Sequence, residues 1–184
     1  MTAQQIFHTA TLAGGCFWCM EAVFERMQGV ESVVSGYIGG VLPDPDYESV
    51  CGGKTGHAEA VQITFDASQV IFRELLAVFF SMHDPTMLNR QGNDIGTQYR
   101  SAIFYHSADQ RLEAQAMIGE LNASQVLAAP IVTEVAAAST FYPAEAYHQH
   151  YFFKHPDQGY CQFVILPKVT KLQEHFSEKL KQEN

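Results

Sequence analysis

The sequence predicts an α+β fold: a ferredoxin-like βαββαβ two-layer sandwich with a C-terminal extension of helices and loops. Two observations lead to this class. Segments with strand-like composition and segments with helical periodicity follow one another in the order strand, helix, strand, strand, helix, strand up to residue 105. The 184 residues, 47% hydrophobic and 17% charged, also suit one compact domain over residues 1–184.

The six elements of the sandwich follow from local composition and periodicity. A short apolar, threonine-rich run precedes a segment whose apolar side chains recur at helical spacing. The strands are expected at 6–13, 31–38, 58–65 and 101–105, and the helices at 16–28 and 68–82. Two long connections, 39–57 and 83–100, are rich in turn-forming and hydrogen-bonding side chains, and we expect both to be loops.

The rest of the chain is expected to extend this core. A helix is predicted at 108–122, a strand at 131–136 and a further helix that begins at Pro143. A last amphipathic helix begins at Pro167. It places four apolar side chains on one stripe: Val169, Leu172, Phe176 and Leu180.

The predicted topology brings distant residues together. In a ferredoxin-like sheet the first two strands run parallel with the third inserted between them, and the fourth flanks the first. The end of the first strand and the starts of the third and fourth therefore meet at one edge of the sheet. We expect Cys16, Glu59 and the loop that ends at Tyr99 to converge there.

Cys16 is the first candidate functional residue. It follows a pair of glycines where strand periodicity changes to helical periodicity, so it lies on a strand-to-helix turn. Unpaired backbone N–H groups and the helix dipole would stabilise a thiolate there and lower the pKa of Cys16. The alternative is a buried cysteine that acts only as a small hydrophobic residue.

Glu59 is the second candidate. Alternation along the third strand places its side chain on the same face as Val61, Ile63 and Phe65. A carboxyl group in a core-facing row is desolvated, which raises its pKa and suits a proton donor near neutral pH. The alternative is that Glu59, at the beginning of the strand, simply reaches water.

Aromatic residues near the thiol could form a pocket. Phe17 and Trp18 are adjacent, so one can pack inward while the other lines a pocket that accepts a small apolar group such as a methyl. Tyr47, in the first long loop, could supply a phenol. Its more common role would be to cover the edge of the core.

Composition excludes several classes of function. The net charge is −9 and basic residues cluster only in the last helix, so we expect neither nucleic acid nor a membrane as a partner. No apolar run is long enough to span a bilayer, and the N-terminus carries no export signal. Four cysteines are too few for a disulfide framework and favour a reducing, cytoplasmic location. The single Cys-x-x-Cys has no partner at ligand spacing, so no metal or cofactor is expected.

Five motifs occur in order along the chain. They are Gly-Cys-Phe-Trp at 15–18, Thr-Gly-His-Ala-Glu at 55–59, Gln-Gly-Asn-Asp-x-Gly-Thr-Gln-Tyr-Arg-Ser at 91–101, Phe-Tyr-Pro-Ala-Glu-x-Tyr-His-Gln at 141–149 and Gly-Tyr-Cys at 159–161. Together they strongly resemble peptide methionine sulfoxide reductase, A type. The resemblance implies a single catalytic domain that reduces the S epimer of methionine sulfoxide, free or in proteins, to methionine.

The resemblance also implies roles for individual residues. Cys16 would attack the sulfoxide sulfur and become a sulfenic acid, while Glu59 would donate a proton. Tyr47 and Tyr99 match the donors to the sulfoxide oxygen. The implied substrate-binding residues are Phe17 and Trp18 around the methyl group and Asp94, His148 and Tyr160 at the polar border.

Which cysteine resolves the sulfenic acid stays open. Cys161 has the matching Gly-Tyr-Cys context and is favoured, while Cys19 lies one helical turn from Cys16 at a position where many relatives have Gly. Cys51 is the least favoured of the three. Thioredoxin would then reduce the disulfide by thiol exchange, and we expect the protein to be a monomer.

Two rival functions use the same residues. A general dithiol–disulfide oxidoreductase would use Cys16 and Cys19 and would not need Glu59. A small-molecule or methionine-binding domain would carry Cys16 as a buried bystander.

Overall fold

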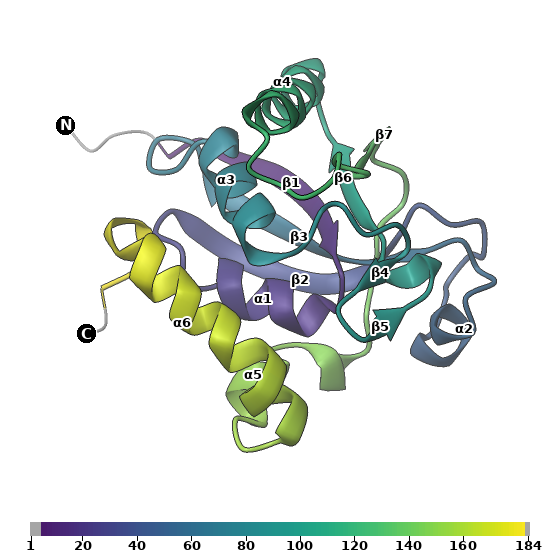
Figure 1. The fold of residues 1–184 in the computed structure, drawn as a ribbon. Coiled ribbons are helices and arrows are strands. Elements are labelled where there is room, and N and C mark those ends of the chain that lie inside the picture. Colours follow the sequence, from purple (N-terminus) through teal and green to yellow (C-terminus); the bar gives the residue numbers. More distant parts are fainter. Residues whose placement is uncertain (1–4, 183–184) are drawn as a thin grey trace.

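The protein, described by a computed structural model for residues 5–182, has a mixed α/β fold around one central sheet (Figure 1). Within this range the sheet has six strands in the order β7-β6-β1-β3-β2-β8, and every pair is antiparallel except β6 and β7. The strands are β1 (Phe7–Gly14), β2 (Val30–Ile38), β3 (Ala58–Asp66), β6 (Ser101–Tyr105), β7 (Glu134–Ala137) and β8 (Tyr142–Pro143). A separate hairpin consists of β4 (Arg90–Gln91) and β5 (Asp94–Ile95).

The helices cover the sheet unevenly. They are α1 (Phe17–Phe24), α2 (Tyr47–Cys51), α3 (Phe72–Met82), α4 (Ala108–Ser124), α5 (Tyr151–Lys154) and α6 (Leu166–His175). Helix α1 packs on β2 and β3 and is covered on its other side by α5 and α6 (Figure 1). Every residue of α1 except Trp18 is therefore buried. None of the helices in the described part of the chain combines the length and apolar character needed to cross a bilayer.

The expected placement of the four central strands is confirmed. Strand β3 lies between β1 and β2, and β6 flanks β1 on its other side. In this register Gly14 pairs with Ser101, and Glu59 pairs with Tyr37 at the same edge. The alternation predicted for β3 also holds, because Glu59 is buried together with Val61, Ile63 and Phe65.

Two expectations for the C-terminal extension are wrong. No helix begins at Pro143: this residue lies in β8 and pairs with Gly36 of β2, and only a short 3-10 helix, Ala146–His148, follows before α5. The Gln149 side chain binds the backbone of Ser35, so contacts with β2 override the local helical pattern. Helix α6 starts at Leu166 and ends at His175, so Phe176 lies beyond its last turn although it still packs against the core.

The first long loop contains a short helix that periodicity did not indicate. Helix α2 begins after Asp46, whose carboxylate accepts the backbone N–H of Ser49 at 2.9 Å. The Ser49 hydroxyl accepts the backbone N–H of Asp46 in return, at 3.2 Å. This reciprocal cap stabilises a helix too short to produce a hydrophobic repeat. The cap fixes Tyr47 in the first turn of α2.

Candidate active site

A cavity of about 200 Å³ opens at the edge of the sheet where the sequence predicted convergence. The starts of α1, α2 and β3 contribute to it, together with the β4–β5 hairpin and the segment before α6. The lining residues are Cys16, Phe17, Trp18, Tyr47, Glu59, Asp94, Tyr99 and Tyr160. Of the predicted substrate-binding residues, only His148 is outside this lining.

A strand-to-helix turn positions Cys16 at the cavity. Gly15 has φ +94, and a Cβ on this residue would lie 2.7 Å from the side chain of Gln91. Only glycine fits this backbone without strain. The next residue, Cys16, is the N-cap of α1 and is 9% exposed. The turn therefore buries most of Cys16, while its thiol still lines the cavity.

Glu59 is tied directly to this turn. Its Oε2 accepts the backbone N–H of Phe17 at 3.0 Å, and its side chain is only 1% exposed. Burial raises the pKa of Glu59 to about 8; the bond from Phe17 opposes this, whereas the nearby charges of Asp94 and Cys19 add to it. Most Glu59 carboxyl groups therefore hold a proton at neutral pH.

The thiols of Cys16 and Cys19 interact and titrate together. The interaction with Cys16 lowers the pKa of Cys19 to about 7 against the effect of burial, with help from Lys168 and Tyr160. Burial and the Cys19 neighbour raise the pKa of Cys16 well above its usual value. The expected lowering at Cys16 itself is therefore wrong, because burial outweighs the helix N-terminus. The pair releases one proton near neutrality, and this pKa belongs to the two interacting thiols together.

The other two cysteines lie on different sides of the site. Cys161 is fully buried in one hydrophobic cluster with Cys16 and Cys19. Cys51, at the end of α2, is half-buried and lies near the phenol of Tyr47. Burial raises the pKa of both Cys161 and Cys51. Cys19 is therefore the thiol best placed, and most readily ionised, next to Cys16.

Three phenols border the cavity. Partial burial raises the pKa of Tyr47 and of Tyr99, so both stay protonated and can donate hydrogen bonds. The Tyr160 hydroxyl donates to Oδ2 of Asp94 at 2.8 Å and lies 3.9 Å from Sγ of Cys19. Asp94 thus anchors the segment that contains Cys161.

The rings of Phe17 and Trp18 form an aromatic wall of the cavity beside the thiol of Cys16. Phe17 is fully buried, whereas Trp18 is half-buried and stacks on Tyr151 with ring centroids 3.7 Å apart and planes 5° apart. The indole N–H of Trp18 donates to Nδ1 of His148 at 3.1 Å. The His148 ring lies 4.4 Å from that of Tyr47. His148 therefore supports the wall from behind the cavity.

Glu145 supports the site, although the sequence motifs predict no role for it. Its Oε1 accepts the hydroxyl of Tyr37 at 2.9 Å, and its Oε2 accepts the backbone N–H of Tyr47 at 3.1 Å. It thereby ties the start of α2 to β2. Only the position of Glu145 inside the Phe-Tyr-Pro-Ala-Glu motif could have indicated a functional role for it, because the residues that it binds are distant in the sequence.

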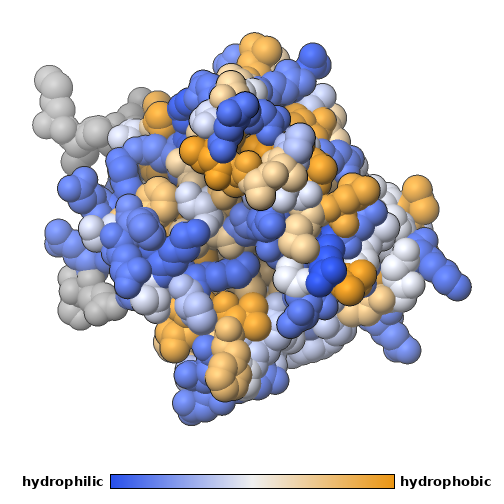
Figure 2. Space-filling model, viewed as in Figure 1, coloured by the Kyte–Doolittle hydropathy of each residue, from blue (hydrophilic) through white to orange (hydrophobic). Residues whose placement is uncertain are grey.

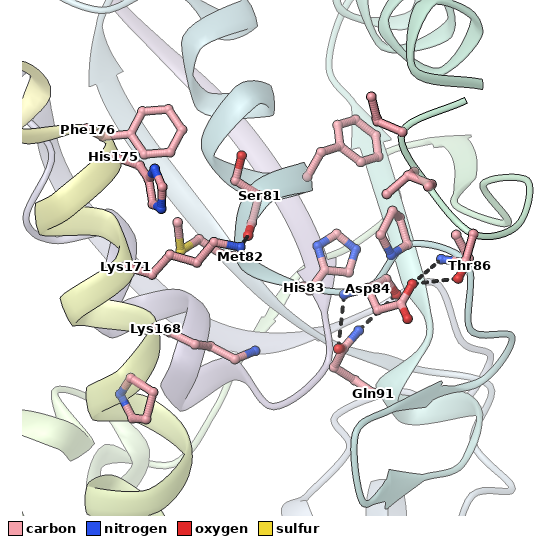
Figure 3. Close-up of a pocket in the computed structure, with 16 residues that line it drawn as sticks. Ser81, Met82, His83, Asp84, Thr86, Gln91, Lys168, Lys171, His175 and Phe176 are labelled. Carbon is pink, nitrogen blue, oxygen red and sulfur yellow. Dashed lines mark hydrogen bonds between the residues drawn. The ribbon is translucent and has the colours of Figure 1, made fainter. Parts of the chain in front are cut away.

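A larger cavity, of about 880 Å³, lies between the end of α3, the α4–β7 connection and α6 (Figure 3). Hydrophobic residues gather toward α4 and hydrophilic ones toward α6 (Figure 2). Both ring nitrogens of His83 are already bonded, to the carbonyl of Phe79 and the hydroxyl of Ser101, and burial lowers the pKa of His83 to about 4. None of the predicted site residues lines this cavity, so the smaller one is the candidate active site.

Comparisons with known proteins agree with the motifs. The family model described as peptide methionine sulfoxide reductase matches residues 8–180. Peptide methionine sulfoxide reductase MsrA of Ralstonia nicotianae is 58% identical over 184 residues, which cover 98% of this chain and 96% of that protein. MsrA of Deinococcus radiodurans is 57% identical over 172 residues, which cover 94% of this chain and 84% of that protein.

Solved structures show the same architecture. Reduced Mxr1 from Saccharomyces cerevisiae matches with a TM-score of 0.76 and 36% identity, over 84% of this chain and 89% of that chain. Methionine sulfoxide reductase A of Corynebacterium diphtheriae matches with a TM-score of 0.75 and 35% identity, over 89% of this chain and 81% of that chain. The chain therefore belongs to the peptide methionine sulfoxide reductase family.

Proposed function

We propose that this enzyme reduces the S epimer of methionine sulfoxide, with Cys16 as the nucleophile and Glu59 as the proton donor. Thiol-dependent reduction of methionine sulfoxide follows from family membership. One observation carries the two roles: a thiol and a protonated carboxyl group, far apart in the sequence, line the same cavity. Assay of dabsylated methionine S-sulfoxide and R-sulfoxide with dithiothreitol tests the proposal. Turnover of the S epimer alone is expected, and equal rates for both would contradict it.

The first step transfers oxygen from substrate to enzyme. As Cys16 attacks the sulfoxide sulfur, the neighbouring Cys19 thiolate accepts the Cys16 proton. Glu59 protonates the sulfoxide oxygen, which is a poor leaving group until it is protonated. The Cys16 sulfur bonds to the substrate sulfur, the S–O bond breaks and the protonated oxygen moves to the Cys16 sulfur. The bond between the two sulfurs then breaks with its electron pair on the substrate sulfur, so methionine leaves and Cys16 becomes a sulfenic acid. Sulfur of the substrate is reduced and sulfur of Cys16 is oxidised.

The cavity lining suits the polar and apolar ends of the substrate. The phenols of Tyr47 and Tyr99 can donate to the sulfoxide oxygen, and their bonds strengthen as negative charge develops on it. Phe17 and Trp18 offer an apolar surface to the methyl group. Asp94, His148 and Tyr160 hold the polar border and the aromatic wall in place.

We assign the first resolving step to Cys19. The Cys19 sulfur attacks Cys16–S–OH, water leaves and a Cys16–Cys19 disulfide forms. Cys161, in the same buried cluster, can then attack Cys19, which forms a Cys19–Cys161 disulfide and releases the Cys16 thiol. This order differs from the preference that the Gly-Tyr-Cys motif suggested. The proximity of Cys16 and Cys19 in one cluster and the lowered pKa of Cys19 favour it.

The position of the disulfide after one turnover tests this order. In the Cys161→Ser variant we expect peptide mapping to find the Cys16–Cys19 disulfide at full yield, because Cys19 contacts Cys16 directly. In Cys19→Ser we expect the sulfenic acid to persist long enough to be trapped by dimedone. Cys51→Ser is the matched control and should behave as the wild type. A Cys16–Cys161 disulfide that forms equally fast without Cys19 would contradict the order.

The pH dependence of alkylation tests the thiol pair. Iodoacetamide reacts with thiolates, so labelling of the pair should rise with pH through about 7, the pKa of Cys19. The rate should be measured by mass spectrometry of the labelled peptides between pH 5 and pH 9, a window of about two units on either side. Cys51, whose pKa burial raises, is an internal control and should label only at higher pH. Uniformly slow labelling at neutral pH would instead fit a bystander thiol.

Further assignments concern the reductant and the form of the protein. A solved structure shows Mxr1 from Saccharomyces cerevisiae in complex with Trx2, and we propose that thioredoxin reduces the disulfide here as well. We also propose a monomer and one catalytic domain, the latter because elements from the start of α1 to the segment before α6 line one cavity. The strand order β6-β1-β3-β2 supports a ferredoxin-like core. The four free thiols fit a reducing, cytoplasmic compartment.

A further inference from the structure

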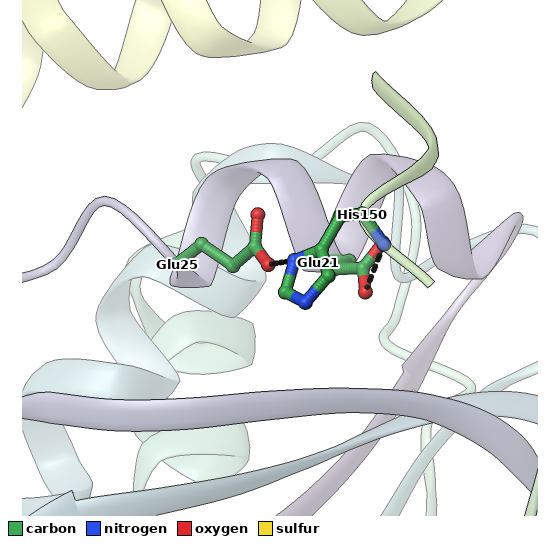
Figure 4. Close-up of side chains that lie close together, drawn as sticks. All are labelled: Glu21, Glu25 and His150. Atoms are coloured by element: carbon green, nitrogen blue, oxygen red, sulfur yellow. Dashed lines mark hydrogen bonds and ion pairs between the residues drawn. The ribbon is translucent and has the colours of Figure 1, made fainter. Parts of the chain in front are cut away.

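A second buried carboxyl group lies on α1, and the reaction described above does not use it. Glu21 is 1% exposed, and burial raises its pKa to about 7 although hydrogen bonds to it have the opposite effect. Keeping a desolvated acid in the interior costs free energy unless its contacts compensate for it. Glu21 points toward the segment that begins α5, where it meets His150 (Figure 4).

Glu21 binds backbone rather than side-chain groups of this segment. Its Oε1 accepts the N–H of His150 at 2.9 Å. His150 has φ +55, the left-handed conformation that residues with a Cβ rarely adopt. The bond to Glu21 holds the chain in this turn, directly before Tyr151, the first residue of α5. Glu25 instead pairs with the exposed side chain of His150.

The turn determines where the Tyr151 ring lies. Tyr151 stacks face to face on Trp18, at 3.7 Å between ring centroids. On its polar edge Trp18 is held by His148, two residues before His150. The indole is therefore fixed from two points on one segment, and Glu21 ties that segment to the helix that also carries Cys16 and Trp18.

We propose that Glu21 is a positioning residue that holds Tyr151 against Trp18 and so keeps the aromatic wall of the substrate cavity in place. The proposal rests on the proposed role of Trp18 in binding the substrate methyl group. Glu21 acts through backbone contacts and does not touch substrate. Glu21 thus holds the aromatic wall in place before substrate binds, through a backbone group 129 residues away in the sequence.

Trp18 is the only tryptophan of the chain, so its fluorescence reports on the wall without any assay of activity. The informative variants are Glu21→Met, which fills a similar volume without an acceptor, and Glu21→Gln, which keeps the Oε1 acceptor. In Glu21→Met we expect shifted Trp18 emission and a roughly tenfold higher KM for methionine sulfoxide, with kcat within about twofold, because binding is lost more than chemistry. Glu21→Gln should restore both values.

Glu25→Gln is the matched control on the same helix. It removes only the ion pair with the His150 side chain and should leave emission and KM unchanged. Unaltered emission and KM in folded Glu21→Met, or the same changes in Glu21→Gln as in Glu21→Met, would overturn the proposal. Should Glu21→Met not fold, Tyr151→Leu must give the shifted emission, or the proposal fails.

Failure of the proposed function has a different signature. If Trp18→Leu leaves KM unchanged, the methyl-binding role of Trp18 is wrong. The emission of Trp18 in the Glu21 variants still decides whether Glu21 positions the indole.

Discussion

Cys16→Ser is expected to lose sulfoxide reduction by ~10⁴-fold or more, the scale seen when the nucleophile of covalent catalysis is removed. A serine hydroxyl is a far weaker nucleophile toward sulfur than a thiolate, and its oxygen cannot form the sulfenic acid on which recycling depends. The substitution changes one atom, so the turn after Gly15 and the bond between Phe17 and Glu59 should persist. Chromatography of dabsylated methionine in a single-turnover reaction measures the loss.

The control for this result is Cys51→Ser, which removes a thiol at the end of α2 that does not line the cavity. Cys51→Ser should reduce methionine sulfoxide in a single turnover at the wild-type rate and should still form the Cys16–Cys19 disulfide. If Cys16→Ser retained activity within tenfold of the wild type, another thiol would have to be the nucleophile, and Cys19 would be the first to test.

Glu59→Gln is expected to slow the reductive step by about 10²–10⁴-fold, the usual contribution of general acid catalysis. Glutamine keeps an oxygen that can accept the Phe17 N–H, so the helix start should remain intact. It cannot release a carboxyl proton to the departing oxygen. The rate should be measured under single-turnover conditions, because recycling of the disulfide could otherwise mask the effect. A rate within about threefold of the wild type would remove the acid role from Glu59.

The pH profile provides a second signature of the same group. The rate requires an ionised Cys16–Cys19 pair, so it should rise as pH increases through about 7. It also requires protonated Glu59, so it should fall as pH increases through about 8. The wild type should therefore have a narrow maximum between these values, with apparent pKa values that belong to the interacting groups together. Glu59→Gln should lose the alkaline fall and keep the acid one.

The meeting of Cys16, Glu59 and Tyr99 could be predicted because strand order fixes which strand ends share an edge. Periodicity alone placed Glu59 in a buried row, and the short separation between strands then brought it to the thiol turn. Such placement depends on backbone geometry, which local sequence patterns encode well.

The pKa order of the two cysteines could not be predicted in the same way. It depends on how deeply α5 and α6 bury the start of α1, and these helices follow more than a hundred residues later. The helix expected at Pro143 failed for a similar reason, since Gln149 binds the backbone of β2. Long-range contacts of this kind leave no local periodic signal.

The periodicity of α1 indicates that Glu21 is buried but does not indicate what it binds. Apolar residues surround it on every side of α1, which is typical of a helix without a solvent-facing side, so a buried carboxyl could have been suspected. Its partner, the backbone at His150, could not have been identified, because a backbone N–H leaves no mark on residue type.

The place of β1 within the sheet links catalysis to the cooperative unfolding of the domain. This strand has hydrogen-bonded neighbours along both edges, β3 and β6, and its last residue leads directly into the nucleophile turn. Releasing that turn requires the extraction of an interior strand, which is a global opening rather than a local one. Amide hydrogens of β1 should therefore be among the slowest in the molecule to exchange with deuterated solvent, and heating should destroy the reactive centre only as the whole domain melts.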